Sequence, residues 1–363
     1  MVIQPKVRKV NLGEERSYNV CFDKLSKLGN EMSNLGLKGK ALILSHSRVM
    51  KLHSKLLLEG LRPYFKTSVC ELPEGEKTKS EDGFSKVLDY CQKNEIERKD
   101  TIICFGGGVI GDLGGYAAAN WSRGTNVVQV PTTLLAQVDA SIGGKTGIDW
   151  KGIKNKLGAF KQPKLVFTDI TTLSTLSSRQ FNNGMAEVIK YGILNAEIFS
   201  TLNSYKLGTE LESRVSDCLS KIVWMCANLK CDFVEKDEFD LNGIRAKLNL
   251  GHTLGHAVEG ASNFELLHGE AVSIGLAAAA RLSARKLGLS FQDLKMIHSL
   301  LVWFNLPTKM KELDKKRVMG LMLSDKKVED GKLNFVLFNK IGNVTFPHHI
   351  TEKEVGNVLT DLS

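Results

Sequence analysis

The sequence predicts an α/β domain built on a parallel sheet, followed by a mainly helical domain. In the first half, short apolar runs alternate with amphipathic segments of helical spacing, which is typical of strand–helix–strand units. Gly106–Gly108 follow one apolar run directly, as at the strand ends of dinucleotide-binding folds. After residue 177, β-branched runs become rare and helical periodicity prevails. We therefore expect the two domains to cover residues 1–177 and 178–363.

Short apolar runs predict the strands of the first domain, at Lys40–Ser45, Ser68–Leu72, Thr101–Phe105, Val127–Val130 and Leu165–Thr168. The segment Glu81–Lys93 is predicted as a helix because its apolar residues recur on one face. Strand and helix thus alternate along the chain, which favours a parallel sheet with helices packed against it.

Helical periodicity dominates the second domain, at Arg179–Leu194, Glu210–Asp232, Leu248–Glu259, His268–Leu287 and Phe291–Phe304. Two late runs, Leu333–Leu337 and Gly342–Thr345, indicate strands of a hairpin. A chain of 363 residues exceeds the usual size of one domain, in agreement with this division.

The composition excludes several classes of protein. With 42% hydrophobic and 25% charged residues, the chain is neither disordered nor fibrous. No apolar run reaches the ~18 residues of a membrane helix, and the N-terminus carries no secretory signal, so we expect no membrane partner. Seven cysteines without a CxxC pair indicate reduced thiols and a cytoplasmic location.

The net charge of +9 has two interpretations. A basic chain can bind nucleic acid, but these charges are interspersed and form no basic arm or RNA-binding motif, so we expect no nucleic-acid partner. A solvated basic surface explains most of the lysines and arginines, while a minority can converge on an anionic small molecule. Composition alone does not choose between a plain surface and such a site.

Two segments of the first domain are suited to binding an anion. Gly106–Asp112 (GGGVIGD) follows a predicted strand, so its glycines let the backbone approach a phosphate closely. It lacks GxGxxG spacing, and a tight turn explains it equally well. Pro131–Lys145 places two threonines at a strand's carboxyl end and adds Asp139 and Lys145, with Lys154 shortly after. For each of these charges a solvated loop is the alternative.

The segment Gly251–Ala257 carries the sharpest signal. His252 and His256 are four positions apart, so on a helix they share a face. His268 begins another apolar helix, and catalytic zinc takes three protein ligands from imidazoles and carboxylates. Either His252 or His256, with His268 and a carboxylate such as Glu187, can supply that set. Hydrogen-bonded core histidines are the alternative, but three of the eight histidines lie within seventeen positions, which favours a metal.

Several segments, in order along the chain, form a pattern longer than any one motif: Gly106–Tyr116 (GGGVIGDLGGY), Arg123–Asp149, Ile153–Lys164, Gly184–Leu194 (GMAEVIKYGIL), Leu248–Glu259 (LNLGHTLGHAVE), His268–Gly275 (HGEAVSIG) and Asp325–Lys327 (DKK). Together they resemble the 3-dehydroquinate synthase family, sugar-phosphate cyclases of the shikimate pathway, which leads to chorismate and the aromatic amino acids.

The resemblance implies a Rossmann-like NAD-binding α/β domain, a helical metal-binding domain, and a metal site in the cleft between them. It implies that Glu187, His252 and His268 bind Zn²⁺ or Co²⁺. The implied NAD contacts are Glu74, Gly75, Glu76, Lys77, Thr78, Lys79, Gly108, Val109, Ile110, Gly111, Asp112, Thr132, Thr133, Lys145, Lys154, Thr172, Leu173, Ser174 and Thr175.

The resemblance also implies a site for a phosphorylated sugar acid. Lys145, Asn155, Lys190 and His256 are the implied phosphate contacts, and His256 is also the implied acid/base; Arg123 is expected to reach in from the second subunit of a homodimer. Arg245 and Lys326 are the implied carboxylate contacts. Asp139, Lys230 and Asn249 are the implied contacts to the substrate hydroxyls.

The implied activity is that of a carbon–oxygen lyase acting on 3-deoxy-D-arabino-heptulosonate 7-phosphate (DAHP). NAD takes a hydride from the C5 hydroxyl, and the ketone formed acidifies the C6 proton. Phosphate leaves by β-elimination, the ketone is reduced back, and ring opening with an aldol step gives 3-dehydroquinate. Zn²⁺ polarises the hydroxyl that is oxidised, and the basic residues stabilise the leaving phosphate.

Other functions remain to be weighed. A sugar-phosphate cyclase of the same fold, of the 2-deoxy-scyllo-inosose or valiolone type, acts on a neutral sugar phosphate. The segment Gly143–Gly147 (GGKTG) together with Arg245 favours a substrate that carries a carboxylate instead. A polyol dehydrogenase of this architecture would release NADH. A nucleic-acid-binding protein without catalysis would leave the glycine and histidine clusters unexplained.

Overall fold

The computed structural model describes residues 6–151, 153–208, 216–311, 313–324, 328–329 and 332–363. The chain divides into two compact units. Unit 1 comprises Met1–Leu176 and Ser213–Phe239, and unit 2 comprises Ser177–Glu212 and Asp240–Ser363. Unit 1 thus includes helix α7 (Asp217–Lys236), which a single division at residue 177 assigns to the second domain.

The core of unit 1 is a sheet in which, among the described residues, seven strands take the order β1-β2-β9-β6-β5-β3-β4. The strands are β1 (Lys6–Val10), β2 (Tyr18–Phe22), β3 (Lys40–His46), β4 (Lys66–Leu72), β5 (Thr101–Gly106), β6 (Asn126–Pro131) and β9 (Leu165–Thr168). All neighbours are parallel except β1 and β2, which pair antiparallel. The predicted parallel sheet is confirmed, and the hairpin β1–β2 is an addition that sequence periodicity missed.

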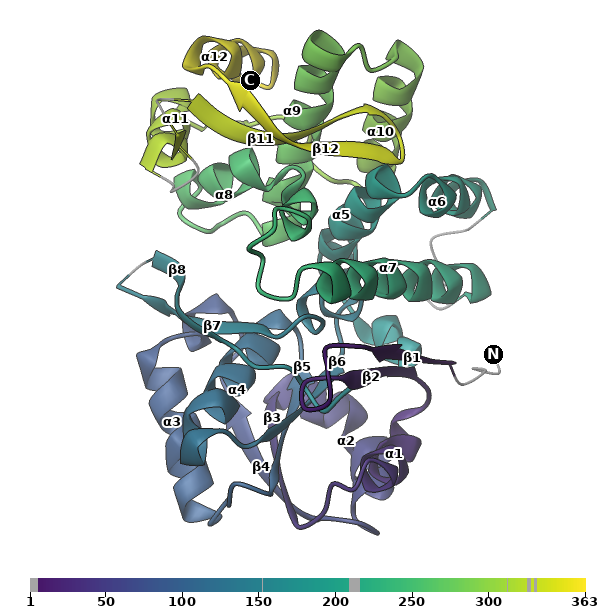
Figure 1. The fold of residues 1–363 in the computed structure, drawn as a ribbon, viewed down its shortest axis with the longest axis vertical. Helices are drawn as coiled ribbons and strands as arrows, with labels where there is room; N and C mark the ends of the chain where they lie inside the picture. The colour runs from purple at the N-terminus through teal and green to yellow at the C-terminus, as the bar shows by residue number, and fades with distance from the viewer. Residues whose placement is uncertain (1–5, 152, 209–215, 312, 325–327, 330–331) are drawn as a thin grey trace. The chain divides into compact units, whose positions relative to one another are not determined.

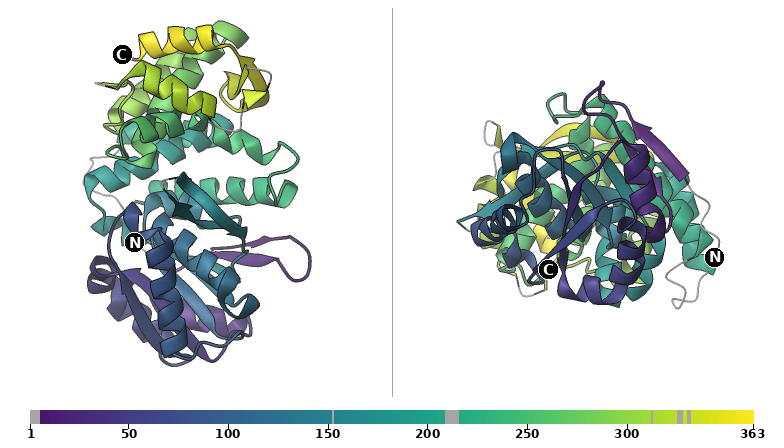
Figure 2. Two further views of the ribbon diagram at one scale, coloured as in Figure 1. Left: turned by 90° about the vertical axis from the view of Figure 1, so that its left-hand side faces the viewer. Right: turned by 90° about the horizontal axis from the view of Figure 1, so that it is seen from below.

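Helices cover both faces of this sheet, α1 (Leu28–Asn34) and α2 (Ser47–Leu61) on one side and α3 (Glu81–Lys93) and α4 (Gly108–Asn120) on the other (Figures 1 and 2). Alternate residues of each strand feed the two cores. On β3, Ile43 packs with Leu57 of α2, whereas Leu42 packs with Val87 of α3. Because both faces are covered, the central strands read as continuous apolar runs, and this is why the sequence revealed them.

Helix α7 joins unit 1 through the hairpin β1–β2. The guanidinium of Arg8 donates to Asp232 at 2.9 Å and to Glu235 at 2.8 Å. Phe22 of β2 and Trp224 of α7 meet edge to face, with ring centroids 5.0 Å apart. These partners are more than 200 residues apart in the chain, so no local pattern could show that α7 packs with the first domain.

Unit 2 is mainly helical, as predicted. Its helices are α5 (Ser178–Leu194), α6 (Ala196–Gly208), α8 (His252–Ala261), α9 (His268–Leu287), α10 (Phe291–Trp303), α11 (Lys315–Ser324) and α12 (Glu352–Asp361), and its strands are β10 (Val328–Glu329), β11 (Lys332–Lys340) and β12 (Asn343–Ile350). The predicted hairpin is β11–β12. No helix among the described residues combines the length and the apolarity needed to cross a membrane.

Two helices begin later than their periodicity suggests. Helix α8 starts at His252 and not at Leu248, because Gly251 adopts a left-handed φ of 80° and Arg245–Asn249 form a separate 3-10 turn. Helix α7 starts at Asp217, where the Ser216 side chain accepts a hydrogen bond from the Leu219 amide. At α8 a backbone feature thus interrupts the apolar pattern, whereas at α7 a side-chain cap marks the first turn. Residues 210–215 of the helix predicted over Glu210–Asp232 lie outside the described residues.

Glycines bring the backbones of α5, α8 and α9 close together. A side chain on Gly269 of α9 would collide with the carbonyl of Asn183 in α5. A Cβ on Gly255 of α8 would lie 3.2 Å from Val272 Cα of α9, and one on Gly275 would collide with the carbonyl of Gly251. The first turns of α8 and α9, with His252 and His268, are therefore held close to each other and to α5.

This packing yields a stability prediction for Gly275→Ala. The added methyl group has no room against Gly251, so α8 and α9 must separate, and we expect the free energy of unfolding to fall by about 3 kcal/mol. Urea denaturation measures the change. The matched control is Gly356→Ala in α12, where an added Cβ meets no atom within 4 Å, and there we expect no loss. Equal stability of the two variants would contradict the packing argument.

Candidate active site

The predicted NAD contacts of unit 1, apart from Lys145 and Lys154 in the hairpin β7–β8, follow the carboxyl ends of parallel strands. Residues 74–79 follow β4 and residues 108–112 follow β5. Thr132 and Thr133 come directly after β6, which ends at Pro131, and residues 172–175 follow β9. Carboxyl ends of parallel strands lie at one edge of a sheet, which is where ligands bind in open α/β folds. The sheet topology therefore gathers four separate sequence segments at a single edge.

Helix α4 presents its N-terminus at this edge. Gly107 caps the helix, and the first turn is Gly108–Asp112. A Cβ on Gly107 would lie 3.0 Å from the Thr133 methyl carbon, so a side chain there would crowd the turn. The amides of a first helical turn lack partners within the helix and attract an anion, which suits the pyrophosphate of a dinucleotide.

The buried Lys79 forms an ion pair with the half-buried Asp112 of this helix. Lys79 Nζ lies 2.5 Å from Asp112 Oδ2 and also contacts Asn155 Oδ1. Burial alone would lower the pKa of Lys79, but the attraction of Asp112 outweighs it and the pKa is raised. Lys154 Nζ lies 3.3 Å from Glu76 Oε1. The hairpin β7 (Lys145–Trp150) and β8 (Ile153–Phe160), which periodicity missed, thereby links to residues 76–79.

Removal of one partner of this pair is expected to destabilise the protein. In Asp112→Ala the ammonium of Lys79, only 5% exposed, loses its nearest counter-charge, and we expect the free energy of unfolding to fall by about 3 kcal/mol. Chemical denaturation measures it. Asp89→Ala, which removes an exposed carboxylate from α3, serves as the control and should change little. A loss no greater than that of Asp89→Ala would show that the ion pair of Lys79 and Asp112 does not stabilise the fold.

The hydroxyls of the predicted residues 172–175 already have protein partners. Thr172 Oγ1 donates to the Asp169 carbonyl at 2.8 Å and accepts from Gln137 Nε2 at 3.1 Å. Thr175 Oγ1 lies 2.9 Å from His53 Nε2. These hydroxyl groups stabilise the turn after β9. A contact of this turn with a cofactor would therefore come from backbone groups and van der Waals packing.

Three predicted substrate contacts occupy different positions in unit 1. Asp139 lies in a π-helical turn, Ala136–Ala140, and its carboxylate contacts Lys230 Nζ of α7. Lys145 is exposed at the start of β7. Arg123 is exposed in the turn after α4, with a left-handed φ of 60°. The structure thus pairs Asp139 with Lys230, two residues that sequence analysis could place only on separate segments.

In unit 2, three predicted metal ligands come together. Glu187 of α5, His252 at the start of α8 and His268 at the start of α9 each offer one ligand atom, and these atoms lie within 4.8 Å of one another. Glu187 Oε1 is 3.5 Å from His252 Nε2 and 3.4 Å from His268 Nε2. The set has three ligands, including two imidazole nitrogens and one carboxylate, as in catalytic zinc sites.

The surroundings of Glu187 fit a bound dication. Its carboxylate is 1% exposed, and neither oxygen has a hydrogen bond of ordinary geometry among the described residues, although Lys190 Nζ contacts Oε2. The pKa of His252 is well below its usual range, mainly through burial and also through Lys190. A neutral imidazole is the form that binds metal. Burial opposes charge on His268, but Glu187 and Glu259 outweigh it and raise its pKa to about 9.

The geometry distinguishes the two histidines of α8. His252 faces Glu187 and His268, whereas His256 is exposed, with its ring centroid 5.3 Å from that of His252 and 6.0 Å from that of His268. Lys190 and Arg245 are buried in unit 2, and Asn249 lies at the end of the 3-10 turn before α8. Lys326 lies outside the described residues.

Sequence reasoning missed one carboxylate of this cluster. Glu259 Oε2 lies 3.6 Å from His268 Nδ1. The signal was present, because His252, His256 and Glu259 are spaced by four and three residues and so share one face of α8.

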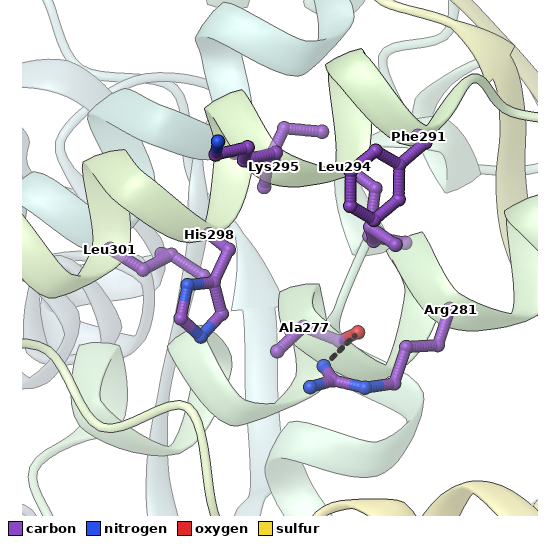
Figure 3. A pocket seen from close by; sticks show the side chains of 9 residues that line it. Ala277, Arg281, Phe291, Leu294, Lys295, His298 and Leu301 are labelled. Atoms are coloured by element: carbon purple, nitrogen blue, oxygen red, sulfur yellow. Dashed lines mark hydrogen bonds between the residues drawn. The ribbon is translucent and has the colours of Figure 1, made fainter.

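A separate pocket of about 270 Å³ lies between α9 and α10 (Figure 3). Apolar side chains such as Leu294 and Leu301 line it together with Arg281 and His298. Arg281 donates a hydrogen bond to the Ala277 carbonyl one turn earlier. None of the residues predicted for the active site lines this pocket, so we assign it no part in catalysis.

Comparison with known proteins gives consistent matches along the chain. Residues 69–183 match the model of the 3-dehydroquinate synthase N-terminal family, and residues 184–328 match that of the C-terminal family. The 3-dehydroquinate synthase of Nostoc punctiforme is 41% identical over 360 residues, which cover 97% of this chain and 98% of that protein. The enzyme of the same name from Pelobacter propionicus is 42% identical over 341 residues, covering 93% and 94%.

Solved structures agree on the fold. A 2-epi-5-epi-valiolone synthase from Streptomyces hygroscopicus, with NAD⁺ and Zn²⁺ bound, superposes with a TM-score of 0.88 at 26% identity over 97% of this chain and 98% of that one. A 2-deoxy-scyllo-inosose synthase in complex with carbaglucose-6-phosphate, NAD⁺ and Co²⁺ superposes with a TM-score of 0.85 at 20% identity, covering 99% and 100%.

Proposed function

The chain belongs to the 3-dehydroquinate synthase family, and from that premise we propose how its residues carry out the conversion of DAHP into 3-dehydroquinate and phosphate. The protein is a carbon–oxygen lyase that depends on NAD and a divalent metal, Zn²⁺ or Co²⁺. Our proposal for the active site rests above all on one observation: Glu187, His252 and His268 cluster together in a chain of this family.

We propose that Glu187, His252 and His268 hold the metal, and that the first turn of α4 with residues 74–79 holds NAD. When bound, the metal supplies Lewis-acid polarisation of a substrate hydroxyl and NAD supplies reversible hydride transfer. The chain's own residues supply the geometry. Burial of Glu187 keeps water from its oxygens, and the free amides of α4 orient the dinucleotide phosphates.

Cationic groups are proposed to bind the charged ends of the substrate. Lys145 and Lys190 would contact the phosphate together with the neutral amide of Asn155, and the two ammonium charges would lower the energy of the developing phosphate anion. Arg245 with Lys326 would hold the carboxylate. His256, exposed beside the metal ligands, would move the proton during β-elimination.

The remaining proposed contacts position the sugar hydroxyls. Asp139 and Lys230 would act as one polar unit, since they already contact each other, and Asn249 would add an amide. In the same proposal the protein is a homodimer in which Arg123 completes the phosphate site of the partner. The exposure of Arg123 in the turn after α4 supports this role.

We also propose that the protein works in the cytoplasm. All seven cysteines lie among the described residues and none forms a disulfide there; six of them are buried. Burial raises the pKa of Cys21 and Cys91 to about 12, so these thiols stay protonated and unreactive at neutral pH. Such a set suits a reducing compartment.

One assay tests the function. Metal-loaded protein with catalytic NAD is incubated with DAHP, and phosphate release is followed. We expect release of phosphate without net accumulation of NADH. Phosphate from glucose 6-phosphate or sedoheptulose 7-phosphate, but not from DAHP, would overturn the proposal in favour of another sugar-phosphate cyclase, which the 41% identity to a 3-dehydroquinate synthase does not favour. Net NADH formation would indicate a dehydrogenase.

A further inference from the structure

We propose that Glu259 is a positioning residue, which orients the imidazole of His268 for metal binding and strengthens that ligand. This inference rests on the ligand set proposed above, and it adds a residue to which neither the sequence motifs nor the comparisons give a role. Glu259 lies in the last turns of α8, and its side chain is 5% exposed.

A carboxylate faces each nitrogen of the His268 ring. Glu187 Oε1 lies 3.4 Å from Nε2, and Glu259 Oε2 lies 3.6 Å from Nδ1. Nε2 is the nitrogen that belongs to the metal-ligand cluster, so Nδ1 must carry the proton of the neutral ligand. The Nδ1–H then points to a carboxylate, and the contact is slightly longer than a hydrogen bond.

The two ring nitrogens of His252 are arranged in the same way. Its Nε2 faces Glu187, while its Nδ1 lies 3.1 Å from the carbonyl of Leu250. Both histidine ligands therefore have an oxygen acceptor behind the nitrogen that is turned away from the cluster. Such partners fix the tautomer and the ring orientation, and a carboxylate also raises the basicity of the ligand nitrogen.

His268 has particular need of such a partner. Its side chain is 32% exposed, compared with 11% for His252, so packing restrains its ring less. It is also the first residue of α9, where no preceding helical turn limits its rotamers. Glu259 is held in place by burial on α8, and the packing of α8 against α9 brings the two side chains together.

The negative charge of Glu259 makes a second contribution. With Glu187 it places two carboxylates around one imidazole, and this potential favours a dication over the water that would otherwise fill the site. A purely structural Glu259 would affect the stability of the metal-free protein but would leave the ligand field of a bound metal unchanged.

The test compares Glu259→Gln and Glu259→Ala with the wild-type protein. Gln keeps the shape and an acceptor oxygen but removes the charge, so it should fold even if Ala does not. The control is Glu265→Gln, which removes an exposed carboxylate from the loop between the same two helices. Zn²⁺ affinity is measured by competition with a chromophoric chelator, and the visible spectrum of the Co²⁺-loaded protein reports the ligand field. Thermal unfolding without metal monitors folding.

We expect Glu259→Gln to raise the Zn²⁺ dissociation constant about 10- to 100-fold and Glu259→Ala to raise it at least as much, with altered Co²⁺ bands in both. Glu265→Gln should behave as wild type. Wild-type Zn²⁺ affinity and Co²⁺ spectra in the folded Glu259 variants would overturn the inference, as would a change in metal-free stability alone.

A further variant separates this inference from the ligand assignment. If His268→Ala loses zinc while Glu259→Gln keeps wild-type affinity, only the role of Glu259 is wrong. If His268→Ala itself retains wild-type zinc affinity, the proposed ligand set is wrong and the inference falls with it.

Discussion

His268→Ala is expected to abolish metal binding and activity together. The substitution leaves Glu187 and His252 as the only members of the three-ligand cluster, and two ligands do not hold zinc firmly. Without the metal, stabilisation of the substrate oxygen is lost. If the transition state loses about 4 kcal/mol of stabilisation, kcat/KM falls about 10³-fold.

Zinc content by atomic emission and steady-state phosphate release from DAHP measure the two effects on the same preparation. His298→Ala is the control, since His298 lies on α10 beside the separate pocket and outside the cluster. It should keep its zinc and its activity. A His268→Ala protein that is folded, full of zinc and active would refute the assignment.

His256→Ala is expected to slow the reaction while leaving the metal in place. His256 shares a face of α8 with His252, yet its ring is exposed and does not belong to the ligand cluster. Its proposed task is proton movement in the elimination. Loss of a general acid or base costs about 10²- to 10⁴-fold, and we expect kcat to fall in that range.

Zinc content and the rate of phosphate release are measured together on the same variant. Single-turnover phosphate release should be slow, while NAD binding and zinc content remain those of the wild type. Loss of zinc from His256→Ala, together with its retention in His252→Ala, would exchange the roles of the two histidines.

Local periodicity was sufficient for the central elements of both units. Strand β9 and helices α3 and α9 have the bounds that the sequence predicted. The reason is that a buried strand or an amphipathic helix shows a recognisable pattern of apolar residues within a short stretch of sequence. The hairpin β7–β8 was not predicted, because many of its residues are exposed or half-buried and show no clear alternation of apolar and polar residues. Helix α4 was missed as a full helix because it contains several glycines, which are poor helix formers.

Those glycines are explained only by packing. A side chain on Gly114 would collide with Cys104 of β5, and one on Gly115 would collide with Thr146 of β7. Close approach to the sheet therefore outweighs helix propensity along α4. In the same way, Arg8 binds Asp232 and Glu235, which lie more than 200 residues later in the sequence. Such tertiary contacts, and not the order of the elements along the chain, place α7 in unit 1.

The sequence by itself determined the family and the parallel sheet followed by helices, because these depend on long ordered motifs and on local periodicity. It also supplied the residues that we propose for binding metal and phosphate. Residue spacing left His252 and His256 open, and the tertiary structure shows that His252 faces Glu187, as the resemblance implied. Only the tertiary structure decided that Asp139 meets Lys230 and that Glu259 lies behind His268. The physical reason is that each of these pairs depends on how separate helices and turns pack. Glycine contacts and buried charges set that packing over distances along the chain that no local pattern spans.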